Sequence, residues 1–116
     1  MSNRSYQSGL EGEEKACKYL ENQGYQVQAT RYRAQGGEID IIARDGTYLV
    51  FIEVKYRPDD RISTGLRAVT GDKRTRMRRA ASAYMANLPR PARMRFDILE
   101  ITRAGVWHKK NVGMGP

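Results

Sequence analysis

The strongest constraint on the fold is a hairpin pattern in residues 36–57, which read GGEIDIIARDGTYLVFIEVKYR. Two alternating apolar runs, at 38–43 and 48–56, lie on either side of Asp45-Gly46, a dipeptide that strongly favours a hairpin turn. The alternation predicts two neighbouring antiparallel strands. Three charged residues interrupt these runs where a strand is expected to stay apolar, and they need a physical explanation: Asp40, Glu53 and Lys55.

The remaining elements follow from periodicity and from boundary residues. Leu10, Cys17 and Leu20 recur at helical spacing, and Gly24 follows as a stop signal, which predicts a helix over residues 5–23. Further strands are predicted at 25–33, 93–101 and 105–109, and a second helix is predicted at 71–88. This order predicts a single α/β domain over 1–116, with a central mixed sheet flanked by helices and a loose tail at 111–116.

Length and charge limit the function classes. The 116 residues suit one domain, and the net charge of +8 favours an anionic partner: nucleic acid, a membrane surface or an acidic protein. The only cysteine, Cys17, allows no internal disulfide, and no stretch has the length of a signal peptide core or a membrane span. We therefore expect a cytoplasmic protein that does not insert into a membrane.

Strand parity predicts that two of the three charges converge. If Asp45-Gly46 forms a two-residue turn, Asp40 pairs with Phe51 and lies diagonal to Glu53 on the same face of the sheet. A slip of one residue would send Asp40 to the opposite face. Two close carboxylates repel unless a proton or a cation neutralises them, and oxygen ligands of this kind suit Mg²⁺ or Mn²⁺.

Neighbouring residues extend this predicted site. The backbone carbonyl of Val54 offers a further metal ligand, and Lys55 shares the face of Glu53, where it could orient or deprotonate a water. Glu13 lies on the apolar stripe of the first helix and would reach the cluster if that helix packs over the sheet. Two alternatives stay open: an ion pair of Lys55 with Glu53 or Asp40 on a solvated face, and a Glu13 that only borders the core.

Basic residues accompany the predicted site. Lys73 lies along the apolar stripe of the second helix, near the sheet, where it could hold a phosphate. On this basis the predicted nucleic-acid-binding residues are Lys73, Arg33, Arg57, Arg74 and Arg76, with ordinary solvated surface as the alternative. Tyr32 and Tyr56 are candidates for stacking on unpaired bases, although strand tyrosines usually pack inside the protein.

Three charged or titratable residues near the C-terminus are predicted to lie outside the active site. Arg95 and Asp97 share one face of a strand, which predicts a local ion pair. His108 is the only histidine, and we expect it at the surface.

Asp40, twelve intervening residues and Glu53-Val54-Lys55 form a D…E-x-K pattern that resembles the core of PD-(D/E)XK nucleases. More closely, GEID followed by FIEVKYR resembles the signature segments of the YraN family of small uncharacterised bacterial proteins. The opening segment GLEGEEKACKYLENQGY and the later RFDIL extend this resemblance over nearly the whole chain. Ile39 instead of proline precedes Asp40, and WHKKNVGMGP departs from the usual family ending.

The resemblance implies a restriction-endonuclease-like (resolvase-like) fold and a Mg²⁺-dependent nuclease site. Asp40 and Glu53 would then hold the metal, Lys55 would be the catalytic lysine, and Glu13 would be the acidic residue of the opening helix. The expected function is a metal-dependent endonuclease that hydrolyses nucleic-acid phosphodiesters, with branched or flapped DNA as one candidate substrate. A resolvase acts symmetrically, which is compatible with a homodimer but leaves the oligomeric state open. The alternatives are a nucleic-acid-binding protein that keeps the fold without cutting, and a structural partner of an acidic protein.

Overall fold

The structure, a computed structural model, describes residues 2–58 and 71–113. Its elements follow in the order α1 (Ser2–Asn22), β1 (Gln26–Ala34), β2 (Gly37–Asp45), β3 (Tyr48–Arg57), α2 (Gly71–Ala86), β4 (Arg93–Thr102) and β5 (Gly105–Lys109). Each element predicted from the sequence is present, with bounds that differ by at most a few residues.

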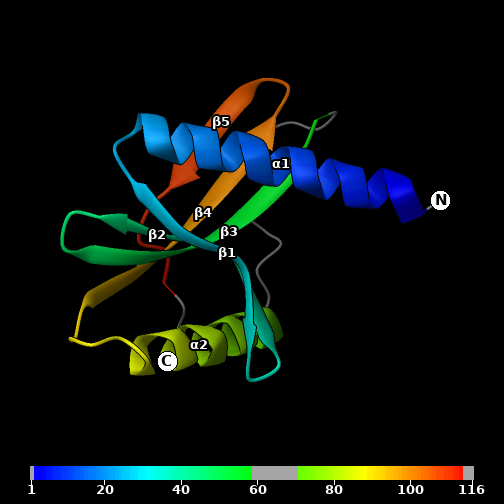
Figure 1. Cartoon of the computed structure of the whole chain (residues 1–116). Helices are drawn as coiled ribbons and strands as arrows, with labels where there is room; N and C mark the ends of the chain where they lie inside the picture. The colour runs from blue at the N-terminus through cyan, green and yellow to red at the C-terminus, as the bar shows by residue number, and fades with distance from the viewer. Residues whose placement is uncertain (1, 59–70, 114–116) are drawn as a thin grey trace.

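The five strands form one mixed sheet in the order β1-β2-β3-β4-β5 (Figure 1). Neighbouring strands are antiparallel except β3 and β4, which are parallel. A parallel pair needs a crossover, because the chain must return to the same end of the sheet, and α2 lies within that connection. The α/β class and the mixed sheet flanked by helices are therefore confirmed, and the arrangement is consistent with a resolvase-like fold.

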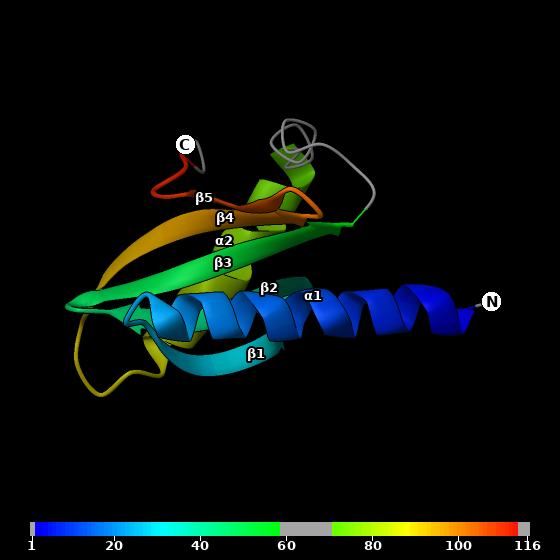
Figure 2. The same cartoon turned by 90° about the horizontal axis from the view of Figure 1, so that it is seen from above.

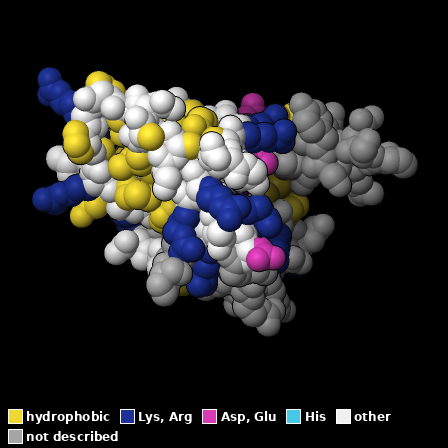
Figure 3. All heavy atoms as spheres, turned by 90° about the horizontal axis from the view of Figure 1, so that it is seen from below, with side chains coloured by type: hydrophobic (Ala, Val, Ile, Leu, Met, Phe, Trp, Pro, Cys, Tyr) yellow, Lys and Arg dark blue, Asp and Glu magenta, His cyan; other side chains and the backbone are white. Residues whose placement is uncertain are grey.

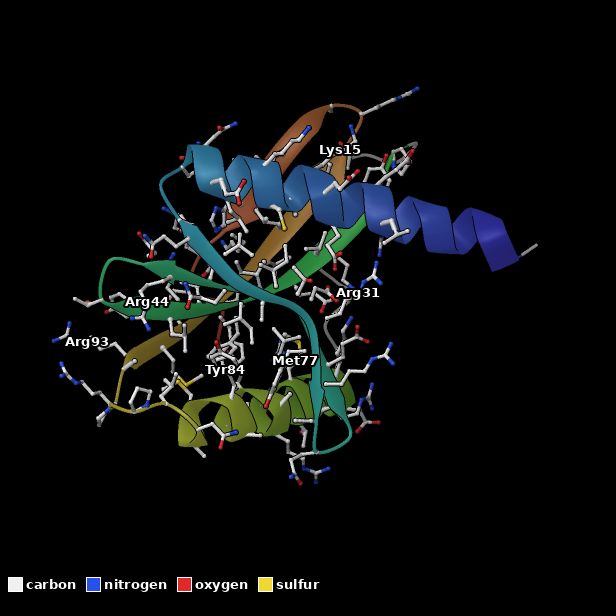
Figure 4. All side chains as sticks on the ribbon, in the orientation of Figure 1. Lys15, Arg31, Arg44, Met77, Tyr84 and Arg93 are labelled. Carbon is white, nitrogen blue, oxygen red and sulfur yellow. The ribbon has the colours of Figure 1, made fainter. Side chains whose placement is uncertain are left out.

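The two helices cover opposite faces of the sheet (Figures 1 and 2). On one face Leu20 of α1 packs with Ile52 of β3, and on the other Met77 of α2 packs with Phe51 of β3. Met77 and Tyr84 point from α2 toward the sheet (Figure 4). We call these faces the α1 face and the α2 face. Neither of the two described helices has the length and apolar character needed to cross a membrane.

The turn of the β2–β3 hairpin is one residue later than predicted. Asp45 pairs with Tyr48, so Gly46 and Thr47 form the turn, and Gly46 has a φ of 60°, which favours glycine. The register therefore differs by two residues from the predicted pairing of Asp40 with Phe51. Because this shift is even, it leaves Asp40 on the predicted face of the sheet.

The segment after β5 is anchored to β4. The Asn111 N–H donates to the Asp97 carboxylate at 2.9 Å, and the Val112 N–H donates to the Phe96 carbonyl at 2.8 Å. Val112 also packs in the apolar cluster on the α2 face. The predicted loose tail therefore does not begin at residue 111, and residues 114–116 lie outside the described residues.

Candidate active site

Strand β2 separates from β3 at Asp40. β2 pairs with β3 only as far as Ile41 with Ile52, but it pairs with β1 as far as Gly37 with Ala34. The outer half of the β1–β2 hairpin therefore leaves β3 and extends to α2 (Figure 1). Asp40 is the first residue beyond the last β2–β3 pair. Its side chain can there accept hydrogen bonds from β3 backbone N–H groups that no longer have a strand partner.

The β1 backbone is strained at the same level. Arg31 lies opposite Asp40 in the β1–β2 ladder and has a φ of 52°, a left-handed conformation that is uncommon for arginine. Figure 4 shows Arg31 between α1 and α2. Such strain persists only where the surrounding structure holds it, and it often occurs at functional sites. Both strands of the hairpin are thus irregular where Asp40 enters the site.

The hairpin tip lies directly against the α2 backbone. A Cβ on Gly37 would lie only 2.1 Å from the Arg76 carbonyl oxygen, so only glycine allows this approach. The tip and the first turns of α2 enclose a pocket of about 540 Å³. Its lining residues are Arg33, Ala34, Gly36, Gly37, Glu38, Lys73, Arg76 and Met77.

Five of the predicted site residues come together beside this pocket. The Val54 N–H donates to Asp40 Oδ2 at 2.8 Å, and continuing the β2–β3 register by one position places Asp40 opposite Glu53. Lys55 Nζ lies 3.0 Å from Glu53 Oε2, and Lys73 Nζ binds the same oxygen. We call these residues the Asp40–Glu53 cluster.

Burial distinguishes this cluster from a solvated ion pair. The Lys55–Glu53 pair that was left open as an alternative is present, but the exposed fractions of the two side chains are only 13% and 4%. Burying two charges costs desolvation free energy, and the attraction between them often does not offset that loss. A gain in folding stability therefore does not by itself account for the burial of these charged side chains.

The pKa shifts in the cluster reflect burial first and neighbouring charges second. Burial, followed by the negative charge of Glu53, raises the pKa of Asp40 to about 7. Burial and the nearby Lys73 lower the pKa of Lys55, although Glu53 opposes this. Burial also disfavours charge on Lys73, but its hydrogen bond and attraction to Glu53 outweigh burial and raise its pKa. Perturbed groups of this kind are concentrated at functional sites.

Glu13 lies beside the cluster and not within it. Its carboxylate binds Arg31 Nε at 3.2 Å, and Arg31 is the residue opposite Asp40. In the described part of the chain no group of three His, Cys, Asp or Glu side chains is close enough to hold a metal ion. The structure thus brings Asp40 and Glu53 together, and it connects Glu13 to them through Arg31.

The predicted nucleic-acid-binding residues are less closely grouped. Arg33 and Arg76 line the pocket next to Lys73, Arg74 is exposed on α2, and Arg57 is half-buried at the end of β3. Lys and Arg side chains gather on the side of the molecule that carries α2 (Figure 3). Lys73 belongs both to the Asp40–Glu53 cluster and to the lining of the pocket, so the cluster borders these basic side chains.

One buried carboxylate near the site was missed in the sequence. Glu100 of β4 is paired in register with Lys55, which places it on the α2 face, and it is 0% exposed. No local sequence pattern predicts that Glu100 lies beside Lys55, because the two parallel strands are joined by a long crossover that leaves their register open.

A second buried polar cluster lies on the α1 face. Asp97 accepts hydrogen bonds from Arg95 at 3.0 and 3.1 Å and from the Asn111 N–H, and its Oδ2 lies 2.7 Å from His108 Nε2. His108 Nδ1 lies 3.1 Å from the Tyr19 hydroxyl. Burial alone would raise the pKa of Asp97, but the bonds from His108 and Arg95 hold it below its usual value. The predicted Arg95–Asp97 ion pair is confirmed, whereas the expected surface position of His108 is wrong.

Comparisons with known proteins agree on one family. The family described as Uncharacterised protein family UPF0102 matches residues 12–101. A UPF0102 protein of Symbiobacterium thermophilum is 45% identical over 94 residues, which is 80% of each chain. UPF0102 proteins of Lachnoclostridium phytofermentans and Cytophaga hutchinsonii are 40% and 41% identical. These matches cover 89% of each chain for the former, and 83% of this chain and 85% of the relative for the latter. The matched segment contains the whole Asp40–Glu53 cluster.

Proposed function

Since the chain belongs to the UPF0102 (YraN) family, whose description names no activity, we propose a function from its own site: a metal-dependent endonuclease that hydrolyses nucleic-acid phosphodiesters, with DNA as the expected substrate. One observation carries this proposal. Two carboxylates, Asp40 and Glu53, converge on the α2 face where β2 leaves β3, and two lysines lie against them. The pocket beside them is lined by further arginines.

The donor set fits a hard divalent cation. Mg²⁺ keeps several waters and takes one or two protein carboxylates together with phosphate oxygens of its substrate. Asp40 and Glu53 supply two carboxylates, and the Val54 carbonyl is the further ligand in the proposal. Burial first, and the negative charge of Glu53 second, raise the pKa of Asp40, so its ionised form requires neutralisation by a nearby positive charge. Mg²⁺ or Mn²⁺ would supply that neutralisation.

The chain's own residues divide the work of hydrolysis. A bound cation would polarise the phosphate and make water a stronger nucleophile. The lowered pKa of Lys55 suits it to orient the attacking water and to accept its proton. Lys73 binds Glu53 and also lines the pocket, so its ammonium group can bind a phosphate oxygen when substrate enters. Through Arg31, Glu13 fixes the strand position opposite Asp40.

A nicking assay with Mg²⁺ or Mn²⁺ on duplex, flapped and four-way DNA tests the proposal. We expect cleavage that chelation abolishes and that Asp40→Asn reduces by about a thousand-fold, with DNA binding retained. Glu14→Gln is the matched control, because it removes the same charge from an exposed position on α1. Equal loss of cleavage in both variants would contradict the assignment of Asp40.

One observation favours a non-cutting alternative. Lys55 and Lys73 already balance the charge of Glu53, as they would in a site that no longer takes a cation. A purified wild-type protein that binds DNA at low salt but leaves every substrate intact with either metal would establish a nucleic-acid-binding protein on a nuclease fold. A protein that neither binds nor cuts would point to an acidic protein as partner.

A further inference from the structure

The edge strand β5 carries the only tryptophan of the chain on the same face as the proposed site. Lys55 pairs with Glu100 across β3 and β4, and Glu100 pairs with Trp107 across β4 and β5. Side chains that are paired in register point to the same face of a sheet. Lys55, Glu100 and Trp107 therefore form one row across the α2 face.

The neighbours of Trp107 confirm its direction. His108 contacts Tyr19 of α1 and pairs with Leu99 of the α1-face core, so the adjacent Trp107 points to the α2 face. Lys109, one residue further, pairs with Ile98, which in turn pairs with Glu53. Trp107 and Lys109 are thus aligned with Lys55 and Glu53.

Trp107 is unusually accessible for its type. Its exposed fraction is 49%, although tryptophan side chains are highly buried on average. Three exposed cations surround it in sequence: Arg103, Lys109 and Lys110. An indole beside several cations suits a nucleotide, because bases stack on aromatic rings while cations hold the adjacent phosphates. The core of a protein–protein interface is instead depleted of charge.

The other candidate stacking residues already pack against other parts of the protein. The Tyr32 ring contacts the Tyr84 ring edge-to-face at 5.2 Å, and Tyr56 lies so close to Gly12 that an added Cβ there would be 2.5 Å from Tyr56 Cβ. Both tyrosines are half-buried. The sequence-based prediction of base stacking therefore suits Trp107 better than either strand tyrosine.

Resting on the function proposed above, we propose that Trp107 stacks on an unpaired base close to the phosphodiester held at the Asp40–Glu53 cluster, and that Lys109 binds a phosphate of that nucleotide. Two strand spacings separate Lys55 from Trp107, about 10 Å between backbones, which an extended strand spans in one or two nucleotides. A base within duplex DNA is already stacked on its neighbours. The substrate class is therefore nucleic acid with an unpaired nucleotide at the cutting point.

Tryptophan fluorescence tests the contact directly, since all tryptophan emission comes from Trp107. The full-length Asp40→Asn protein is titrated at low salt with a short oligothymidylate, a flapped duplex and a blunt duplex. Binding is followed separately by the anisotropy of a label on the DNA. We expect quenching by the oligothymidylate and the flapped duplex over the concentrations at which anisotropy rises, and little quenching by the blunt duplex. Binding without quenching, or no binding at all, would overturn the inference.

Substitutions separate stacking from a structural role. Trp107→Ala should weaken oligothymidylate binding about ten-fold, and Trp107→Phe should restore most of that loss. Val106→Ala is the matched control, because Val106 is similarly exposed at 39% but points to the α1 face. Equal losses in the Val106 and Trp107 variants would overturn the proposal.

The same variants show whether nucleic acid or a second copy of the chain binds at Trp107. They also separate failure of the stacking proposal from failure of the hydrolysis proposal. If Trp107→Ala changes the mass by light scattering but leaves oligothymidylate affinity intact, the surface contacts a second copy of the chain and the stacking proposal fails. If quenching occurs in the Asp40→Asn protein while the wild-type protein cuts nothing, the stacking proposal stands and hydrolysis alone fails.

Discussion

The two faces of the sheet each bury a carboxylate cluster, and the clusters are built in opposite ways. On the α1 face, Asp97 is surrounded by donors from Arg95, His108 and Asn111, and its pKa is lowered. On the α2 face, Asp40 accepts one described hydrogen bond, from Val54, and its pKa is raised to about 7.

This contrast supports the proposal that the α2-face cluster binds a ligand, whereas the hydrogen bonds of the α1-face cluster hold the fold together. Buried polar groups in proteins are normally hydrogen-bonded, as Asp97 is. A carboxylate placed beside another carboxylate with few donors destabilises the folded chain, and such sites are retained where binding or catalysis requires them. Two predictions test this contrast directly, and a third tests how the hairpin beside Asp40 is held on α2; they run from the largest expected effect to the smallest.

Asp97→Asn should destabilise the protein by about 3–5 kcal/mol at neutral pH, since it leaves Arg95 without its buried charge partner. Because the pKa of Asp97 is lowered, its contribution is complete above the ordinary value of 3.8 and is lost only in acid below it. Urea unfolding measures the change. Asp45→Asn, which removes a more exposed partner of Arg95, is the control and should cost about 1 kcal/mol or less. A similar loss of unfolding free energy in both variants would contradict the greater structural role assigned to Asp97.

Asp40→Asn should have the opposite sign and stabilise the protein by up to about 4 kcal/mol near pH 8. The raised pKa means that the folded state binds more protons than the unfolded state between 3.8 and about 7. Wild-type stability from this group therefore falls as the pH rises through that window, and it is constant above it. Urea unfolding of both proteins near pH 4 and pH 8 should show a gap that widens with pH. A gap that is constant or negative would contradict the reading of Asp40.

Gly37→Ala should cost about 1–3 kcal/mol, because the added methyl would overlap the Arg76 carbonyl and displace the hairpin tip from α2. Thermal unfolding measures the loss. Gly9→Ala is the control, since a Cβ there meets nothing within 4 Å and alanine favours a helix. If Gly37→Ala were as harmless as this control, the tip would not be fixed on α2.

Local patterns in the sequence predicted most of the fold and the core of the candidate site. Alternation located β2 and β3, and parity placed Asp40 and Glu53 on one face even though the turn was misplaced, because an even register shift preserves faces. What those residues do stays a prediction.

Features that depend on distant partners were beyond the sequence. The burial of His108 depends on Asp97 and on Tyr19, 89 positions away, and no local pattern reports them. The face occupied by Trp107 requires the registers of both β3–β4 and β4–β5. The left-handed conformation of Arg31 could not be anticipated, because no glycine or proline marks that position of β1.

The crossover between the parallel strands has a consequence for the newly made protein. Asp40, Glu53 and Lys55 emerge together from the ribosome on one hairpin, but Lys73 belongs to the helix that follows and reaches Glu53 only when α2 lies against the sheet. An incomplete chain would thus carry both acidic groups without the pocket or the basic surface of α2. The polyanion binding proposed above would therefore require a chain in which α2 has already been synthesised and packed against the sheet.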